Sequence, residues 1–405
     1  MVDLEVDILI VGGGLTGAIL LYVLELANVN CLLIDSANIA AKITGDFDAR
    51  SIALSSASIR ILKNLHIWDK IKADTAIIDK IHVSEKGRFG SSEFVGHTEE
   101  PFGFVVEMQH LQNGITNMLN LNLILTESSV ESYDRNTNIA TIQTPTGIKF
   151  VKTKIVVAAD GANSSMRRFV NLPANVKDYG HQAIVANIGL NRDHKNIAYE
   201  RFTKYGPLAL LPMLGNRASL VWSLSIRDTA ETMALSDEEF LKKLQDIFGY
   251  RLGKFIKIGK RNIFPLRQII MPKTSTGNVI FIGNAAHTLH PVAGQGFNLG
   301  LRDVATLAES IIKFGLSLNM FDEYQRLRHH DQKAITYLTQ GLVSIFTNKF
   351  PGLGLARGLG LIAIDNSSIL KNLLATYTRG FAGSMPDLVC NIPMSNKTTI
   401  LESTV

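Results

Sequence analysis

The sequence predicts an α/β protein in which a nucleotide-binding domain is interrupted by an antiparallel sheet and followed by a helical tail. A glycine turn of the form G-x-G-x-x-G at residues 12–17 lies between an apolar strand and an apolar helix. A second glycine-rich segment, residues 283–298, follows another short apolar strand far downstream. Between about residues 183 and 270 apolar and polar residues alternate, which is typical of half-buried antiparallel strands. Two distant glycine-rich segments can fold onto one ligand, with the alternating region as a separate domain.

The bulk composition indicates a folded protein with more than one core. The chain has 405 residues, which is too long for one ordinary core and fits two interleaved domains with a tail. Hydrophobic residues make up 46% and charged residues 19%, so the chain is globular rather than disordered. The net charge of +5 has two interpretations, ordinary solubility or a surface that contacts anionic lipid. No dense run of Lys and Arg with interleaved aromatic residues occurs, so no nucleic acid is expected as a partner.

The cysteines and the first residues indicate the compartment. Only Cys31 and Cys390 are present, which argues against a disulfide framework and for a reducing, cytoplasmic compartment. Residues 1–5 carry two acids and no basic stretch, so no signal peptide is expected. No apolar run of roughly 18 residues occurs, so no membrane-spanning helix is expected either.

The first element is a β-α-β unit. An apolar strand at Val6–Val11, an apolar helix at Ala18–Ala27 and a second strand at Cys31–Ile34 follow one another. The second strand ends at Asp35, whose carboxylate can accept hydrogen bonds from both hydroxyls of a ribose. An acid at this place favours a ribose without phosphate, and therefore FAD or NAD over NADP.

The three glycines of the turn have separate physical roles. Gly12 allows the tight turn, Gly14 lets the backbone approach a pyrophosphate, and Gly17 lets the helix and the strand pack closely. The amino-terminal end of the helix then faces the phosphates.

The rest of the chain predicts a discontinuous arrangement of domains. Residues 1–75, 105–180 and 271–345 are assigned to the nucleotide-binding domain, and residues 76–104 and 181–270 to the inserted substrate domain. Residues 346–405 form the helical tail. Leu208, Leu210 and Pro212 are candidates for the substrate-facing side of the inserted sheet, with plain core packing as the alternative.

Two further segments carry polar groups that suit a dinucleotide. Asp160 begins the pattern D-G-x-x-S-x-x-R after a buried strand, and Arg167 at its end can reach back to the turn. Arg50, at the start of the next helical segment, is a candidate clamp for the pyrophosphate, because a guanidinium makes bidentate contacts. A solvated arginine is the alternative for Arg50, and an ordinary β-turn is the alternative for Asp160.

The segment from residue 283 to residue 298 is similar to the second flavin-binding segment of an aromatic-ring hydroxylase. Gly283 and Asn284 end a strand, and Asn284 can bond a ribityl hydroxyl where this fold usually has an aspartate. Gly294 and Gly296 let the backbone run beside an isoalloxazine ring. Phe297 and Asn298 open a helix whose dipole can stabilise negative charge at the flavin N1/O2 edge.

His287 and His290 lie three residues apart in this segment. No acid or cysteine cluster is near them in the sequence, so no metal site is expected.

Together these segments resemble the class A flavin-dependent aromatic hydroxylases, and within them the ubiquinone-biosynthesis group. The resemblance covers roughly residues 5–360. It rests on these segments: Phe47–Leu54, Gly103–Glu107, Glu200–Phe202 and Gly206–Pro212. Asn284, with His82–Ser84 and the pair Lys86–Gly87, is similar to the subgroup that hydroxylates 2-octaprenyl-6-methoxyphenol.

The resemblance implies a fold, a reaction and partners. The fold is the FAD-binding Rossmann-like (GR2) fold of the p-hydroxybenzoate hydroxylase type. In the implied reaction NAD(P)H binds transiently and reduces FAD. O2 then adds at the flavin C4a carbon, and a hydroxyl group passes to a prenylated phenol. The resemblance places the Pro291 backbone beside C4a, so Pro291 and the adjacent His290 are the candidate catalytic residues.

Two alternatives to this function remain open. The membrane or protein surface at which the protein meets its substrate is a separate question. One is a hydroxylase for another ubiquinone-pathway intermediate, and the other is a flavoprotein subunit of a quinone-biosynthesis complex that has lost turnover. A prenylated substrate implies contact with the inner membrane or with a partner's groove. Ile345–Phe346 and Leu359–Ile364 of the tail are candidate contacts, with packing on the flavin domain as the alternative.

Overall fold

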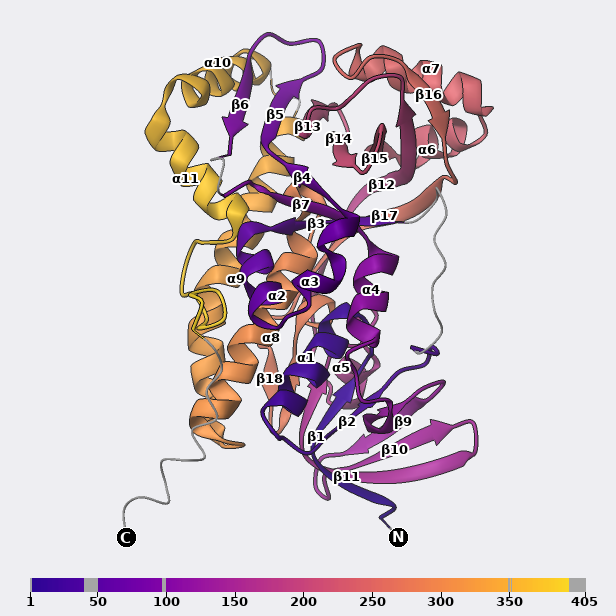
Figure 1. The fold of residues 1–405 in the computed structure, drawn as a ribbon, viewed down its shortest axis with the longest axis vertical. Helices are drawn as coiled ribbons and strands as arrows, with labels where there is room; N and C mark the ends of the chain where they lie inside the picture. Colours follow the sequence, from indigo (N-terminus) through magenta and orange to yellow (C-terminus); the bar gives the residue numbers. More distant parts are fainter. Residues whose placement is uncertain (1, 40–49, 97–99, 349, 351, 393–405) are drawn as a thin grey trace.

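The computed structural model describes residues 2–39, 50–96, 100–348, 350 and 352–392. Two large sheets lie at opposite ends of the long axis, and a three-stranded sheet lies between them (Figure 1). The three-stranded sheet has the order β3-β7-β4, with strands Ser51–Ser55, Gly103–Glu107 and Thr75–Ile78. The α/β class with an inserted antiparallel sheet and a helical tail is therefore confirmed.

The first large sheet is built around the β-α-β unit. Its main path is β18-β19-β11-β1-β2-β8, and β1 pairs in parallel with both β2 and β11. Strands buried on both faces are typical of such a sheet, and all four residues of β2 are buried. A hairpin of β9 and β10 extends the sheet beside β11. The bounds are β1 Leu4–Val11, β2 Cys31–Ile34, β8 Ile124–Leu125, β9 Ser129–Asp134, β10 Ile139–Thr144, β11 Gly147–Ala158, β18 Ser275–Thr276 and β19 Val279–Phe281.

Helices α1 and α8 pack against this sheet and share one large hydrophobic core with α2. Helix α1 is apolar nearly all round, and seven of its residues are buried, as expected of a helix in the middle of a core. The helices of this half are α1 Leu15–Leu26, α2 Ser56–Asn64, α3 Trp68–Ile71, α4 Met108–Thr116, α5 Ser165–Phe169 and α8 Gln295–Phe314. Short 3-10 turns lie at Lys72–Asp74 (η1), Leu121–Leu123 (η2), Gly283–Ala285 (η3) and Val292–Gly294 (η4).

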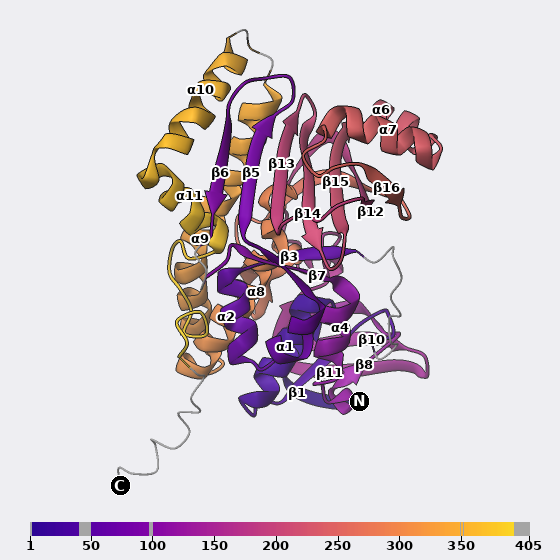
Figure 2. The same ribbon diagram turned by 45° about the horizontal axis from the view of Figure 1, so that its top comes forward.

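The second large sheet has the order β20-β17-β12-β15-β14-β13-β5-β6, with β16 beside β12. Helices α6 (Ile226–Met233) and α7 (Asp237–Phe248) cover its outer face (Figure 2). The strands are β5 Lys80–Glu85, β6 Ser91–Val95, β12 Asn175–Leu190, β13 Ile197–Thr203, β14 Gly206–Met213, β15 Arg217–Ser225, β16 Phe255–Ile258, β17 Asn262–Ile270 and β20 His287–Thr288. Strand β20 belongs to the segment 283–298, so this sheet reaches the glycine-rich segment directly.

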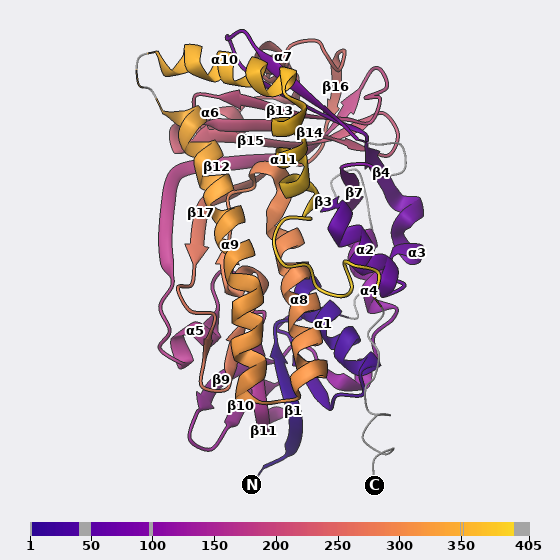
Figure 3. The ribbon, with the colours of Figure 1, turned by 90° about the vertical axis from the view of Figure 1, so that its left-hand side faces the viewer.

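The C-terminal third is helical and then returns to the first half. Helix α9 (Leu318–Thr347) runs along the long axis beside α8, and α10 (Leu353–Asn366) crosses the end of the antiparallel sheet (Figure 3). Helix α11 (Ser368–Arg379) leads back, and Leu388 and Val389 are buried in the core around α1 and α2. Among the described helices none alone has the length and apolar character for a membrane span, whereas α10 and α11 together meet that test with a 94° bend between them.

Candidate active site

The first glycine turn has the shape of a phosphate-binding turn. Gly12 has φ +105°, and a Cβ there would lie 2.5 Å from the carbonyl oxygen of Ala159. A Cβ on Gly17 would lie 1.9 Å from the oxygen of Gly12, so the helix and the turn require glycine at both places. A Cβ on Gly14 would meet no atom of the described residues within 4 Å. Protein packing therefore does not explain Gly14, and the open space before helix α1 fits the approach of a ligand.

Asp35 is already engaged by the backbone. Its two carboxylate oxygens accept hydrogen bonds from the N–H groups of Gly13 at 2.5 Å and Ala37 at 2.6 Å. A carboxylate can accept about four hydrogen bonds, so capacity for ribose hydroxyls remains. Gly13 was not singled out from the sequence, although a Cβ there would lie 2.0 Å from Ile39 Cδ1.

Arg50 is exposed, and its guanidinium lies over the ring of Phe264 in β17, 5.6 Å from the ring centroid. This contact places it beside β17. The expectation that Arg50 starts a helical segment was wrong, because strand β3 follows it directly and pairs with β7. Its role as a pyrophosphate clamp stays a prediction, and residues 47–49 of its motif lie outside the described part of the chain.

Asp160 and Arg167 connect two of the three segments. One oxygen of Asp160 accepts hydrogen bonds from Ser165 Oγ at 3.2 Å and Met166 N at 3.1 Å, while its Oδ1 is buried without a partner among the described residues. Arg167 donates to the carbonyl of Ala162 in the same turn and to the carbonyl of Ala285 at 2.6 Å. The expected reach of Arg167 back to its own turn is confirmed. Its second bond fixes the turn against η3.

The segment from residue 283 packs against the first glycine turn. A Cβ on Gly283 would lie 3.1 Å from the side chain of Thr16, and one on Gly300 would lie 3.2 Å from Thr16 Oγ1. Helices α1 and α8 therefore meet where the two glycine-rich segments lie. Asn284 lies beside this contact, and its side chain is exposed. Its backbone carbonyl accepts a hydrogen bond from Thr288 Oγ1 at 3.1 Å.

A buried charged network supports this segment from behind. Asp303 on α8 accepts hydrogen bonds from Gly283 N at 3.0 Å, His287 Nε2 at 2.5 Å and Arg328 Nε at 2.8 Å. Burial raises the pKa of Asp303, but the charges of His287 and Arg328 outweigh it and hold that pKa below its ordinary value. Arg328 also pairs with Asp331 on α9. This network was not anticipated from the sequence, because its members lie on separate elements.

The structure gives His290 and Pro291 different environments. His290 is buried, its Nδ1 accepts a hydrogen bond from Val292 N at 3.3 Å, and its ring contacts Tyr179 edge-on. Burial, together with His181, lowers the pKa of His290 to about 4, so the ring is neutral at pH 7. Pro291 is exposed, and its carbonyl accepts a hydrogen bond from Gly294 N at 3.0 Å. The catalytic roles of both residues stay predictions.

Asn298 holds the turn that precedes α8. Its amide oxygen accepts from Ser55 N at 2.9 Å and Ser58 Oγ at 2.7 Å, and its amide nitrogen donates to the carbonyls of Ala53 at 2.9 Å and Gly294 at 2.8 Å. All four hydrogen-bonding positions of the side chain are filled by protein. Asn298 therefore shapes the site as a positioning residue.

Gly294, Gly296 and Phe297 complete this turn. Gly294 has φ +59°, which favours glycine, and a Cβ on Gly296 would meet nothing within 4 Å in the part of the chain that the structure describes. Phe297 packs partly buried against the core around α1. The open space at Gly296 matches that at Gly14, and both fit a ligand lying along the two turns.

The inserted sheet presents one face to this turn, and we call it the inner face. It carries Ala198, Leu211 and Met213, which pack with Ala53 of β3 in one cluster. A Cβ on Gly294 would lie 3.3 Å from the Cβ of Ala53, so this cluster adjoins the turn. Leu208 and Leu210 lie on the opposite face.

The expectation that Leu208, Leu210 and Pro212 face the substrate was wrong. Leu208 and Leu210 are fully buried against Phe240 and Leu244 of α7, and Pro212 lies on the same side of β14. Side chains alternate between the two faces of a strand. The even-numbered residues of β14 were expected on the substrate side, whereas the odd-numbered ones lie there.

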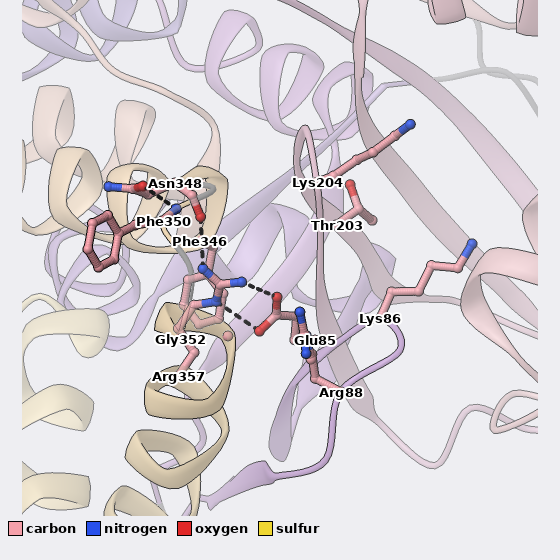
Figure 4. A pocket seen from close by; sticks show the side chains of 11 residues that line it. Glu85, Lys86, Arg88, Thr203, Lys204, Phe346, Asn348, Phe350, Gly352 and Arg357 are labelled. Atoms are coloured by element: carbon pink, nitrogen blue, oxygen red, sulfur yellow. Dashed lines mark hydrogen bonds and ion pairs between the residues drawn. The ribbon is translucent and has the colours of Figure 1, made fainter.

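A cavity of about 370 Å³ lies elsewhere, at the outer edge of this sheet (Figure 4). It lies between the end of β5, the turn after β13 and the connection from α9 to α10. Glu85 and Arg357 form a two-bond ion pair in it, at 2.9 and 2.6 Å, while Lys86 and Lys204 point away from that pair. Neither the two glycine-rich segments nor the segment that begins at Asp160 lines this cavity. In the described ranges no group of three His, Cys, Asp or Glu residues is placed to hold a metal.

The comparisons with known proteins agree with this geometry. Residues 5–337 match the family described as FAD binding domain. The chain is similar to ubiquinone hydroxylase UbiL of Rhodospirillum rubrum, with 32% identity over 97% of this chain and 94% of the relative. It is also similar to 3-demethoxyubiquinol 3-hydroxylase of Escherichia coli, with 27% identity over 94% of this chain and 100% of the relative.

Solved structures show the same fold. The p-nitrophenol 4-monooxygenase PnpA from Pseudomonas putida superposes with a TM-score of 0.76 at 18% identity, covering 93% of this chain and 99% of that one. PqsL of Pseudomonas aeruginosa gives a TM-score of 0.72 at 20% identity, covering 89% and 100%. The open turns at Gly14 and Gly296 and the unpartnered Asp160 oxygen fit FAD, the cofactor of this family. The chain belongs to the FAD-binding domain family and is one of its FAD-dependent monooxygenases, in the group that includes the ubiquinone hydroxylases.

Proposed function

We propose that this protein hydroxylates a prenylated phenol of ubiquinone biosynthesis, of the 2-octaprenyl-6-methoxyphenol type, with NAD(P)H and O2. The similarity to ubiquinone hydroxylases along nearly the whole chain supports the pathway. One structural observation carries the substrate class. The turn at residues 294–297 is called the flavin turn from here on. Val185, Leu211 and Val221 lie on central strands and on the face toward this turn, yet all three keep part of their surface accessible. Half-exposed apolar side chains at the centre of a sheet border a space suited to an apolar-substituted ring.

The residues of this chain divide the work between binding and orientation. When FAD is bound, the cofactor would carry the chemistry with O2. Gly14 and the end of helix α1 would receive its pyrophosphate, Asp35 its ribose, and Asn284 its ribityl chain. The turn at Gly294, held by Asn298, would support the cofactor ring on the side that faces the inner face. Pro291 fixes a backbone carbonyl there, and the apolar inner face excludes water from the ring.

Product analysis tests this proposal. The FAD-loaded protein is incubated with NAD(P)H, O2 and 2-farnesyl-6-methoxyphenol, and hydroxylated product is measured by mass spectrometry. Product together with phenol-stimulated NAD(P)H oxidation supports the proposal. Product only from a different ring-substituted intermediate indicates the other pathway hydroxylase, and bound FAD without turnover on any of them indicates the non-catalytic subunit. Mass spectrometry of the quinone precursors that accumulate when the gene is deleted identifies the natural step.

We also propose that the protein binds peripherally to an anionic membrane through its C-terminal helices. The cytoplasmic leaflet of the inner membrane is such a surface. Leu355 and Leu359 on α10 are 55% and 54% exposed, and Ile369 and Leu373 on α11 are 78% and 54% exposed. Phe350, just before α10, is 73% exposed. Residues spaced three or four apart share a helix face, so each helix presents an apolar stripe to solvent.

The charges around these stripes favour anionic lipid over a neutral surface. Exposed Lys86 and Arg88 lie beside the start of α10, whereas the nearby acid Glu85 is neutralised by Arg357. Basic residues beside exposed apolar ones fit an anionic interface. Phe346, expected as a contact, is instead buried and stacks on Phe202 with 3.6 Å between ring centroids.

Vesicle sedimentation tests the membrane surface. The holoenzyme should bind vesicles containing phosphatidylglycerol more tightly than vesicles of phosphatidylcholine alone. The double variant Leu359→Ser with Leu373→Ser should weaken binding at least tenfold, because burying each leucine contributes about 1.5–3 kcal/mol. Ile256→Ser, which changes an equally exposed apolar residue on β16, is the control. Unchanged binding of the double variant would assign the stripes to a protein partner.

A further inference from the structure

Glu200 lies on the inner face of the antiparallel sheet. On β13 it alternates with Tyr199 and Arg201, and Tyr199 packs on the outer face against Phe248. Its cross-strand neighbours are Ala209 on β14 and Val83 on β5. Glu200 therefore shares its face with residues that adjoin the flavin turn.

Apolar clusters flank Glu200 on both sides along the strand. Ala198, two residues before it, packs with Ala53 and Ala375, and Phe202, two residues after it, packs with Phe346 and Leu342. Ala53 is the residue whose carbonyl is held by Asn298 at the start of α8. This continuity places Glu200 on the same inner face as Val221 and Leu211.

The carboxyl group of Glu200 has no compensating partner in the described structure. Its Oε1 atom is buried without a hydrogen bond, while the residue as a whole is half-buried. Burial alone raises the pKa of Glu200 to about 8. A carboxyl group left without a partner in apolar surroundings costs stability, so packing does not explain it.

The charged groups on neighbouring elements are engaged elsewhere. Glu85 on β5 pairs with Arg357 of α10, and Arg217 on β15 pairs with Glu107 at 2.8 Å. Arg201 donates to the carbonyl of Ile247 beneath the outer face, and Arg379 of α11 lies over the ring of Phe102. None of them contributes to the altered pKa of Glu200.

We propose that Glu200 contacts the phenol hydroxyl of the substrate and accepts its proton. This inference rests on the proposed function, because it requires a phenol at the inner face. In the step the phenol O–H bond breaks and an O–H bond to the Glu200 carboxylate forms. The electron pair stays on the phenolate oxygen, and nothing is oxidised or reduced. The phenolate then donates electron density into the ring, which makes the ring carbons more reactive toward an electrophilic oxygen.

The environment of Glu200 suits this transfer. A phenol has a pKa of about 10 and an ordinary glutamate about 4.3, so transfer between them is unfavourable by a factor of about a million. With a carboxyl pKa of about 8 the factor falls to about a hundred. Glu200 becomes an acceptor only when it is ionised, so product formation should rise with pH through about 8.

Two measurements on the FAD holoenzyme test the contact. The first compares the affinity for 2-farnesyl-6-methoxyphenol with that for its methyl ether, followed by perturbation of the flavin spectrum. The wild type should prefer the phenol, and Glu200→Gln should lose about ten- to a hundredfold of that preference. The second is the rate of product formation, which Glu200→Gln should lower by about a hundredfold or more, with loss of the rise near pH 8. Glu200→Asp should restore part of both.

A more acidic substrate separates proton transfer from a structural effect. A fluorinated analogue whose phenol is already ionised at the assay pH needs no base, so its hydroxylation should be nearly insensitive to Glu200→Gln. Glu131→Gln, at an exposed glutamate on β9, is the matched control. A Glu200→Gln variant that keeps the phenol preference, the rate and the pH profile would overturn the inference. A wild type that prefers the phenol through Glu200 yet forms no product would overturn the proposed function instead.

Discussion

The side chain of Gln295 donates a hydrogen bond to the backbone carbonyl of Thr378, with 3.2 Å between Nε2 and the oxygen. Gln295 is the first residue of α8, next to the turn that faces the inner sheet, whereas Thr378 lies near the end of α11. Arg302 of α8 also donates to the carbonyl of Gly380 at 3.0 Å. The end of α11 and the residue that follows it therefore hold the first turns of α8 in place, in addition to any contact that α10 and α11 make outside the protein.

Removal of this segment is expected to remove FAD. A chain that ends at residue 375 loses Thr378, Gly380 and the buried Leu388 and Val389, whose burial alone contributes about 3–6 kcal/mol. We expect a lower Tm and little FAD retained after gel filtration, measured by flavin absorbance. A chain that ends at residue 392 keeps every described contact and serves as the control. Full flavin content in the shorter chain would show that the contacts of Gln295 and Arg302 are dispensable.

The buried network around Asp303 gives a second prediction. Asp303→Asn should lower the free energy of unfolding by about 3–5 kcal/mol, because it removes the charge that pairs with His287 and one of the two carboxylates that pair with Arg328. The pKa of Asp303 is lowered on folding, so its stabilisation is present above about pH 4 and is lost as the pH falls. The difference between variant and wild type should accordingly shrink in acid. Denaturant unfolding at pH 7 and at about pH 2.5, below the pKa of an ordinary aspartate, measures it, and an equal difference at both would contradict this account.

The local elements could be predicted because each has its own sequence signal. The helix expected at Ala18–Ala27 is found at Leu15–Leu26, and the strand at Cys31–Ile34 has the expected bounds. Helix α7 has a capping box at Ser236 and Glu239, which marks its start in the sequence. The parity of β14 could not be predicted with the same security, because apolar residues occupy both of its faces and alternation gives no direction.

Roles within the site were harder to predict, because they depend on partners distant in sequence. Asn298 belongs to the expected flavin segment, but its side chain is fully used by β3, α2 and Gly294. The bond between Gln295 and Thr378 spans 83 residues and has no local pattern. Glu200 belongs to the family-like segment Glu200–Phe202, but only the sheet register shows that it lies on the inner face, toward the flavin turn.

Asn284 should tolerate a carboxylate but not an apolar side chain. Its side chain is exposed beside Gly283, where a neutral amide can bond the ribityl chain. Asn284→Asp keeps the shape and an acceptor and should retain FAD, whereas Asn284→Leu should lose it. Flavin content after denaturation measures both. Equal flavin content in Asn284→Leu and the parent would refute the role.

Pro291 should matter for coupling rather than for cofactor binding. Its carbonyl accepts from Gly294 N at 3.0 Å, and the proline ring fixes φ at −66°. Pro291→Ser should keep FAD, because the phosphate turns lie elsewhere, but it should loosen this carbonyl. A displacement of 1 Å can cost on the order of a hundredfold in rate. NAD(P)H should still be consumed while hydrogen peroxide replaces product, and full product yield per NAD(P)H would remove Pro291 from the active site.

Glu200 should also leave a signature in the pH dependence of stability. Burial raises the pKa of Glu200 to about 8, so the folded state binds a proton that the unfolded state releases near pH 4.5. The stability associated with this proton is complete below pH 4.5 and is lost as the pH rises through about 8. Glu200→Gln mimics the protonated form at every pH. The variant and the wild type should therefore be equally stable near pH 4.5, and at pH 9 the variant should be more stable by on the order of 2–5 kcal/mol. Thermal unfolding across this range, with Glu131→Gln as the control, measures the difference, and a constant offset between the two proteins would show that Glu200 ionises at an ordinary pKa.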